Sequence, residues 1–121
     1  MSTARSVLVL ETDQATRSLF GEWLGGEGWQ VVDLPLAGVD APPSLIVLEL
    51  AFLRGDGLQP LAEAKLRYPG VPILVVSPTV FASVSCCGPC AVALGVAGVL
   101  PKPIARETLI EAANRLARPA S

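Results

Sequence analysis

A short apolar run, Leu45–Leu50, carries a single carboxylate at Glu49. Pro42 and Pro43 precede the run and Gly57 follows it, so turn signals bound it on both sides. Apolar runs of four to eight residues between turn signals are typical of buried strands of a parallel sheet. A carboxylate near the end of such a strand costs free energy unless it is paired, binds a metal or reaches solvent. Ligands bind at the carboxyl ends of parallel strands, so Glu49 is the first candidate site residue.

The rest of the chain alternates between apolar runs and helical patterns. We expect the other strands at 6–11, 29–34, 71–76 and 98–100, and helices at 14–24, 58–68, 89–95 and 105–117. Residues 34–43 contain three prolines and a glycine, which leave room for one helical turn at most. This alternation predicts an α/β fold, a doubly wound parallel sheet with helices on both faces. One domain is expected over residues 1–121, with an ordered core at about 5–117.

Helical spacing and capping signals give more detailed expectations for these helices. Thr12 and Asp13 form a turn and a candidate N-cap for the first helix, which Gly25 and Gly26 are expected to stop. The expected inward faces are Leu19, Phe20, Trp23 and Leu24; Leu58, Leu61, Ala62, Lys65 and Leu66; and Leu109, Ile110, Ala113 and Leu116. Asp56 is expected to cap the second of these helices.

Composition excludes several classes of protein. The net charge is -2 and no basic tract is present, so no direct contact with nucleic acid is expected. No apolar stretch approaches the roughly 20 residues of a membrane span, and no signal peptide is recognisable, so a cytoplasmic location is the default expectation. The chain has no histidine, which removes the commonest general base and metal ligand and argues against most hydrolases.

The order and spacing of several motifs resemble the receiver domain of bacterial two-component response regulators. The motifs are an acid-ended first strand at 8–11, the apolar run ending at Glu49, Gly55-Asp56-Gly57, Ser77 after the fourth strand, Gly95, and Lys102-Pro103. The resemblance covers residues 7–116. It implies a flavodoxin-like five-stranded sheet of order 2-1-3-4-5, here with a shortened or absent second helix. It also implies a phosphoacceptor Asp, two acids that hold Mg²⁺, and a Ser or Thr and a Lys that contact the phosphoryl group.

Several of these family positions are changed in this chain. Glu49 stands at the phosphoacceptor position, and Thr12 stands at the second acid unless Asp13 substitutes for it. Val99 replaces the aromatic residue that switches rotamer in the family, whereas Ser77 and Lys102 are retained. The resemblance therefore implies a degenerate site, in which Glu11, Asp13 and Glu49 are weak Mg²⁺ candidates and no cofactor is required.

The longer side chain of Glu49 has two consequences. It moves the carboxylate by about 1.5 Å relative to Asp, and a misplacement of about 1 Å can cost roughly 100-fold in rate. It can also reach toward Lys102, where a pair would mimic the charge arrangement of the phosphorylated state. We therefore predict a pseudo-receiver in which Glu49 pairs with Lys102. The alternative is that this pair serves stability alone.

A second cluster, Cys86-Cys87-Gly88-Pro89-Cys90, looks like a thioredoxin active-site tetrapeptide at Cys87–Cys90. A thiol at a helix N-terminus has a lowered pKa, so disulfide exchange is plausible chemistry here. The position of the motif argues against an oxidoreductase, because only residues 91–121 follow it. Three thiols without histidine leave a tetrahedral metal site incomplete. Packing of small cysteines in a loop and a redox-responsive Cys87–Cys90 pair are the alternatives.

Three functions compete on this evidence. The first is a non-enzymatic signalling module that contacts a protein partner or a fused effector domain. The contact is expected through residues 89–116, the face that the family uses, and a homodimer is also possible. The second is a phosphorylatable receiver that uses Glu49 or Asp13 with Mg²⁺. The third is a thiol redox sensor at Cys87 and Cys90. A flavin-binding role is remote, because Glu11 and Asp13 would repel phosphate after the first strand.

Overall fold

The computed structural model describes residues 5–11, 13–32, 43–50, 55–78, 92, 94–102 and 104–117, without the side chains of residues 55 and 56. Its strands are β1 (Ser6–Leu10), β2 (Gln30–Val32), β3 (Leu45–Glu49), β4 (Ile73–Ser77) and β5 (Gly98–Pro101). Its helices are α1 (Gln14–Gly26), the 3₁₀ turn η1 (Gly55–Leu58), α2 (Gln59–Arg67) and α4 (Arg106–Leu116). The predicted shortening of the second helix concerns residues 34–43, which lie almost entirely outside the described ranges.

The five strands form one parallel sheet in the order β2-β1-β3-β4-β5, which confirms the predicted order. The three central strands, β1, β3 and β4, are almost wholly buried, as expected for strands covered on both faces. The register places Leu10 beside Leu48, Glu49 beside Val76, and Ser77 beside Pro101. The last residues of the strands therefore align along one edge of the sheet.

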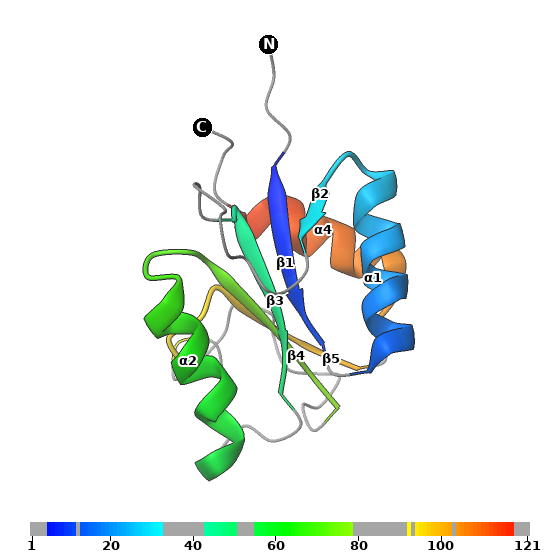
Figure 1. Ribbon diagram of the computed structural model, residues 1–121. Helices are drawn as coiled ribbons and strands as arrows, with labels where there is room; N and C mark the ends of the chain where they lie inside the picture. The colour runs from blue at the N-terminus through cyan, green and yellow to red at the C-terminus, as the bar shows by residue number, and fades with distance from the viewer. Residues whose placement is uncertain are drawn as a thin grey trace.

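Helices lie on both faces of this sheet, as predicted. Figure 1 shows α1 and α4 on one side and α2 on the other. Alternate strand residues divide accordingly between two core clusters. The first joins Val7, Val9, Leu45, Val47, Leu74 and Val76 to Phe20 and Leu24 of α1 and Leu109 and Ala113 of α4. The second joins Leu8, Ile46, Leu48, Ile73, Val75 and Val99 to Leu61 and Ala64 of α2.

The first helix differs from its predicted form at two places. It ends at Gly26, at the predicted glycine pair but two residues beyond the predicted last residue, Leu24. The left-handed residue that follows the helix is Gly28, with φ +92°, a conformation that glycine adopts without steric cost. Phe20 and Leu24 are buried as expected, whereas Leu19 is 41% exposed and lies outside the core.

The inward face of α2 was predicted about one residue out of phase. Leu61 and Ala64 are buried, whereas Lys65 is exposed and Leu66 is 85% exposed. The buried positions are spaced by three residues, and the small side chain at Ala64 permits close approach to the sheet. The predicted face on α4 is correct for Leu109, Ile110 and Ala113, which are buried. No helix of the described part of the chain is both long and apolar enough to cross a membrane.

Candidate functional site

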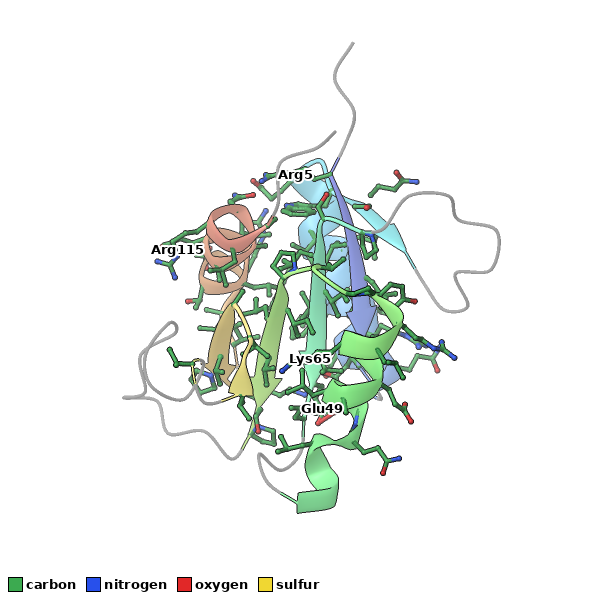
Figure 2. The ribbon with its side chains drawn as sticks, turned by 90° about the vertical axis from the view of Figure 1, so that its left-hand side faces the viewer. Arg5, Glu49, Lys65 and Arg115 are labelled. Carbon is green, nitrogen blue, oxygen red and sulfur yellow. The ribbon has the colours of Figure 1, made fainter. Side chains whose placement is uncertain are left out.

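Four of the predicted site residues lie at the same edge of the sheet. Glu11 follows β1, Glu49 ends β3, Ser77 ends β4 and Lys102 follows β5. The backbone N–H of Lys102 donates to the Ser77 carbonyl at 3.0 Å, which ties the end of β5 to the end of β4. Figure 2 shows Glu49 at this edge, next to α2, and Arg5 at the opposite end of the sheet. The parallel topology therefore brings together residues that are up to 91 positions apart.

An ion pair between Lys102 and Glu11 is the main electrostatic contact of this edge. The Lys102 Nζ lies 3.1 Å from Glu11 Oε2, and the Glu11 side chain is only 2% exposed. The other carboxylate oxygen, Oε1, accepts a hydrogen bond of 3.2 Å from the backbone N–H of Asp13. Both oxygens of this buried carboxylate are thus satisfied, as burial of a charge requires.

Glu49 lies partly buried at the end of β3, beside the buried end of β4. We predicted a contact between Glu49 and Lys102, and this contact stays a prediction. The carboxylate that lies 3.1 Å from the Lys102 Nζ is that of Glu11. Extending the β1–β3 register by one residue places Glu11 next to Glu49. Both acids line a hollow of about 320 Å³ that also includes Arg17 of α1 and Glu63 and Arg67 of α2.

Asp13 serves as the N-cap of α1, as predicted. Its carboxylate accepts hydrogen bonds from the backbone N–H of Thr16, at 3.0 Å, and from the Thr16 hydroxyl. These two bonds favour the charged carboxylate, and they hold the pKa of Asp13 below its usual value. An N-cap acid satisfies donors that the first turn of a helix would otherwise leave unpaired. The carboxylate is therefore engaged in capping the N-terminus of α1.

This capping geometry predicts a dependence of stability on acid pH. Because the folded-state pKa of Asp13 is lowered, its stabilising effect is complete above the unfolded pKa and is lost as the pH falls through the folded one. Asp13→Asn keeps a capping oxygen but does not titrate. We expect the wild type to lose more stability than Asp13→Asn between about pH 4 and pH 2, measured by urea unfolding across this range. Parallel curves for the two proteins would contradict the assignment.

The donor set at this edge does not fit a Mg²⁺ ion well. Mg²⁺ requires oxygen ligands in a near-octahedral arrangement and is bound through free carboxylates. Here the Glu11 carboxylate already accepts from Lys102 and Asp13, and the Asp13 carboxylate accepts from Thr16. Within the described ranges, no group of three or more His, Cys, Asp or Glu residues is placed to hold a metal. An ion bound to Glu11 would share this carboxylate with the Lys102 ammonium and the Asp13 N–H.

Some predicted site residues cannot be placed, and one pairing was missed. Thr12, Cys86, Cys87 and Cys90 lie outside the described residues, as does the side chain of Asp56. The Lys102–Glu11 pair was missed because sequence spacing does not fix side-chain direction. One signal was available, since a buried acid directly after a central strand, as Glu11 is after β1, needs a cation or a metal ion as its partner.

Comparison with known proteins agrees with this geometry. No protein-family model matches the chain. The chain is 33% identical over 108 residues to the "Regulator of RpoS" of Escherichia coli strain K12, with 83% of this chain covered. The chain spans about a third of the length of that relative, 31%.

Solved structures extend the comparison to the fold. NtrX from Brucella abortus in complex with ADP has 26% sequence identity and a TM-score of 0.71, covering 94% of this chain and 27% of that one. The chemotaxis response regulator CheY4 of Vibrio cholerae has 21% identity and a TM-score of 0.71, covering 94% of this chain and 99% of that one. A CheY-like receiver domain protein from Methanospirillum hungatei has 19% identity, a TM-score of 0.71 and 93% coverage of both chains. The five-stranded sheet, its strand order and these similarities together identify the chain as a receiver domain of the response-regulator type.

Proposed function

We propose that this receiver domain signals through protein contacts without being phosphorylated, with Glu49 in place of a phosphoacceptor Asp. The observation that carries the proposal is the ion pair between Lys102 and the buried Glu11, at 3.1 Å. In the receiver family the lysine at this position contacts the phosphoryl group, and the acid after the first strand holds the metal ion. In this chain the two side chains neutralise one another.

Charge at the phosphoacceptor position supports the same proposal. Phosphoryl transfer needs a correctly placed oxygen and a divalent ion to neutralise developing charge. Glu49 places its carboxylate farther from the backbone than Asp would, and the carboxylate of Glu11 is occupied by Lys102 and the Asp13 N–H. The Glu49 carboxylate provides an acidic group at the position where phosphorylation would add charge. The state of the domain is then set by its sequence and by its partner.

The proposed partner is a protein or a fused effector domain that contacts the face formed by β5 and α4, within residues 89–116. Family analogy supports this face. The curated relative is about three times as long as the matched region. Its remaining length leaves room for a further domain beside the receiver-like part, which is why we include a fused effector among the proposed partners. We propose no catalytic role for the domain.

Titration with beryllofluoride, a phosphoryl analogue, tests the proposal on the wild-type chain in the presence of Mg²⁺. We expect no saturable binding by calorimetry or by ¹⁹F NMR, because the acceptor is too long and Glu11 is paired with Lys102. Fluoride and Mg²⁺ without beryllium give the baseline. Saturable binding that is lost in Glu49→Gln would show that Glu49 is a working acceptor and would refute the proposal.

A further inference from the structure

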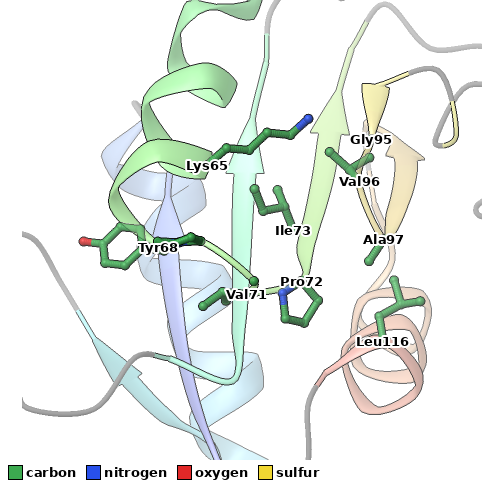
Figure 3. A pocket seen from close by; sticks show the side chains of 11 residues that line it. Lys65, Tyr68, Val71, Pro72, Ile73, Gly95, Val96, Ala97 and Leu116 are labelled. Carbon is green, nitrogen blue, oxygen red and sulfur yellow. The ribbon is translucent and has the colours of Figure 1, made fainter.

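Lys65 of α2 reaches across to the turn that leads into β5. Its Nζ donates a hydrogen bond to the backbone carbonyl of Leu94 at 2.6 Å. Figure 3 shows the side chain extending from α2 toward Gly95 and Val96, at the rim of a hollow of about 670 Å³. Its lining includes residues that precede or begin β4 and β5, and neither Glu11 nor Glu49 is among them. Lys65 is therefore neither a core residue nor part of the candidate site.

The turn that Lys65 contacts is the end of a helical segment. Val92 and Leu94 are helical, and Gly95 has φ +68° and donates its N–H to the Val92 carbonyl at 3.1 Å. A left-handed glycine is a common helix C-cap, and the last carbonyls of a helix lack intrahelical donors. A lysine ammonium is favourable at this end of a helix because it satisfies a carbonyl and complements the dipole.

The backbone of Gly95 makes room for the Lys65 ammonium. A Cβ atom at Gly95 would lie 2.8 Å from Lys65 Nζ, closer than real contacts permit. The absence of a side chain at Gly95 thus serves two purposes, the left-handed conformation and the approach of Lys65. A side chain at position 95 would push the Lys65 ammonium away from its present place.

We propose that Lys65 is a latch that fixes the turn at Leu94 and Gly95 to α2. On the other side, the turn is held where the N–H of Ala97 donates to the Ile73 carbonyl at 2.9 Å. Leu94 and Val96 are only partly buried against the second core cluster, so apolar packing alone holds the turn weakly. Lys65 thereby sets the shape of one margin of the proposed partner-binding face, residues 89–116, although Lys65 itself lies outside that range. The importance of the latch for partner binding rests on the proposed function, whereas the latch itself does not.

Amide hydrogen exchange measured by NMR on the full chain tests the latch. In Lys65→Met we expect the Gly95 N–H to exchange about tenfold faster, because a charge-assisted hydrogen bond to the turn is lost. The amides of Val75 and Val99 in the sheet should be unchanged. Arg67→Met, which removes another exposed cation from α2, should leave Gly95 exchange within twofold, and Lys65→Arg should retain protection.

A second variant distinguishes the latch from a general effect of charge. Gly95→Ala places a methyl group against Lys65 Nζ, so Lys65→Met should change exchange less than twofold at residues 94–97 in that background. Equal acceleration in Lys65→Met and Arg67→Met, or full additivity with Gly95→Ala, would refute the latch. Such a failure would leave the Glu49 proposal intact, because that proposal rests on Glu49 and on the Lys102–Glu11 pair and not on the Lys65–Leu94 contact.

Discussion

Replacing Lys102 with methionine is expected to lower the free energy of unfolding by about 3 kcal/mol, because it leaves the Glu11 carboxylate buried without its counter-charge. The Glu11 side chain is 2% exposed and that of Lys102 is 21% exposed, so solvent screens this pair little. The Asp13 N–H remains as a partner for Oε1, which places the expected loss at the lower end of the range for broken buried pairs. Urea unfolding monitored by tryptophan fluorescence gives the measurement.

Two further variants make this prediction specific to the pair. The double variant Glu11→Gln/Lys102→Met removes both charges, and we expect it to recover most of the lost stability, since a buried pair replaced by neutral residues costs little. Arg106→Met is the matched control. It breaks the Arg106–Glu27 pair at 2.9 Å, whose side chains are 41% and 40% exposed, and should cost less than about 1 kcal/mol. Similar losses in Lys102→Met and Arg106→Met would show that Glu11 is not held by Lys102.

The strands, their order and one helix cap could be predicted from the sequence. Apolar runs such as Leu45–Leu50 identify the strands, because a parallel strand covered on both faces needs apolar side chains at nearly every position. The strand order came from the resemblance to receiver domains, and the sheet confirms it. Asp13 was predictable as an N-cap because capping depends only on residues three positions apart.

The errors have physical causes that periodicity alone cannot resolve. On α2, the stripe of Leu61 and Ala64 and the stripe that includes Lys65 and Leu66 differ by about 100° around the helix axis. The second stripe is the more apolar by eye because of Leu66, yet it faces solvent. The approach of Ala64 to the sheet and the reach of Lys65 to Leu94 fix the rotation, and both are tertiary contacts. On α1, Leu19 lies at the margin of the buried stripe and was wrongly included.

The candidate site was predictable as a place but not as a set of contacts. Any parallel sheet with this order brings the residues after β1, β3, β4 and β5 to one edge. Which acid Lys102 contacts depends on side-chain torsions, and Glu11 and Glu49 are equivalent candidates from the sequence alone. The observed contact is with Glu11. We therefore propose that Lys102 and a divalent ion would compete for the Glu11 carboxylate.

Restoring the family's acids should convert the site into one that binds a phosphoryl analogue. In Glu49→Asp/Thr12→Asp we expect saturable beryllofluoride binding with Mg²⁺, at least about 100-fold tighter than in the wild type, because a displacement of about 1 Å at a reacting group costs roughly that factor. The shorter Asp returns the acceptor oxygen to the family position, and the second acid adds an oxygen ligand that helps the ion compete with Lys102 for the Glu11 carboxylate. Calorimetry and ¹⁹F NMR measure the binding.

The single variants determine which departure blocks the site. Glu49→Asp alone leaves Glu11 paired with Lys102 and should bind the analogue more weakly than the double variant, whereas Thr12→Asp alone keeps the long acceptor and should not bind it. Glu49→Gln/Thr12→Asp, which has no carboxylate at the acceptor position, is the negative control. If the double variant binds no better than the wild type, side-chain length at Glu49 and the missing acid are not what prevents phosphorylation. The pairing of Lys102 with Glu11 would then have to be tested as the sole barrier, by adding Lys102→Met, which removes the cation, to the double variant.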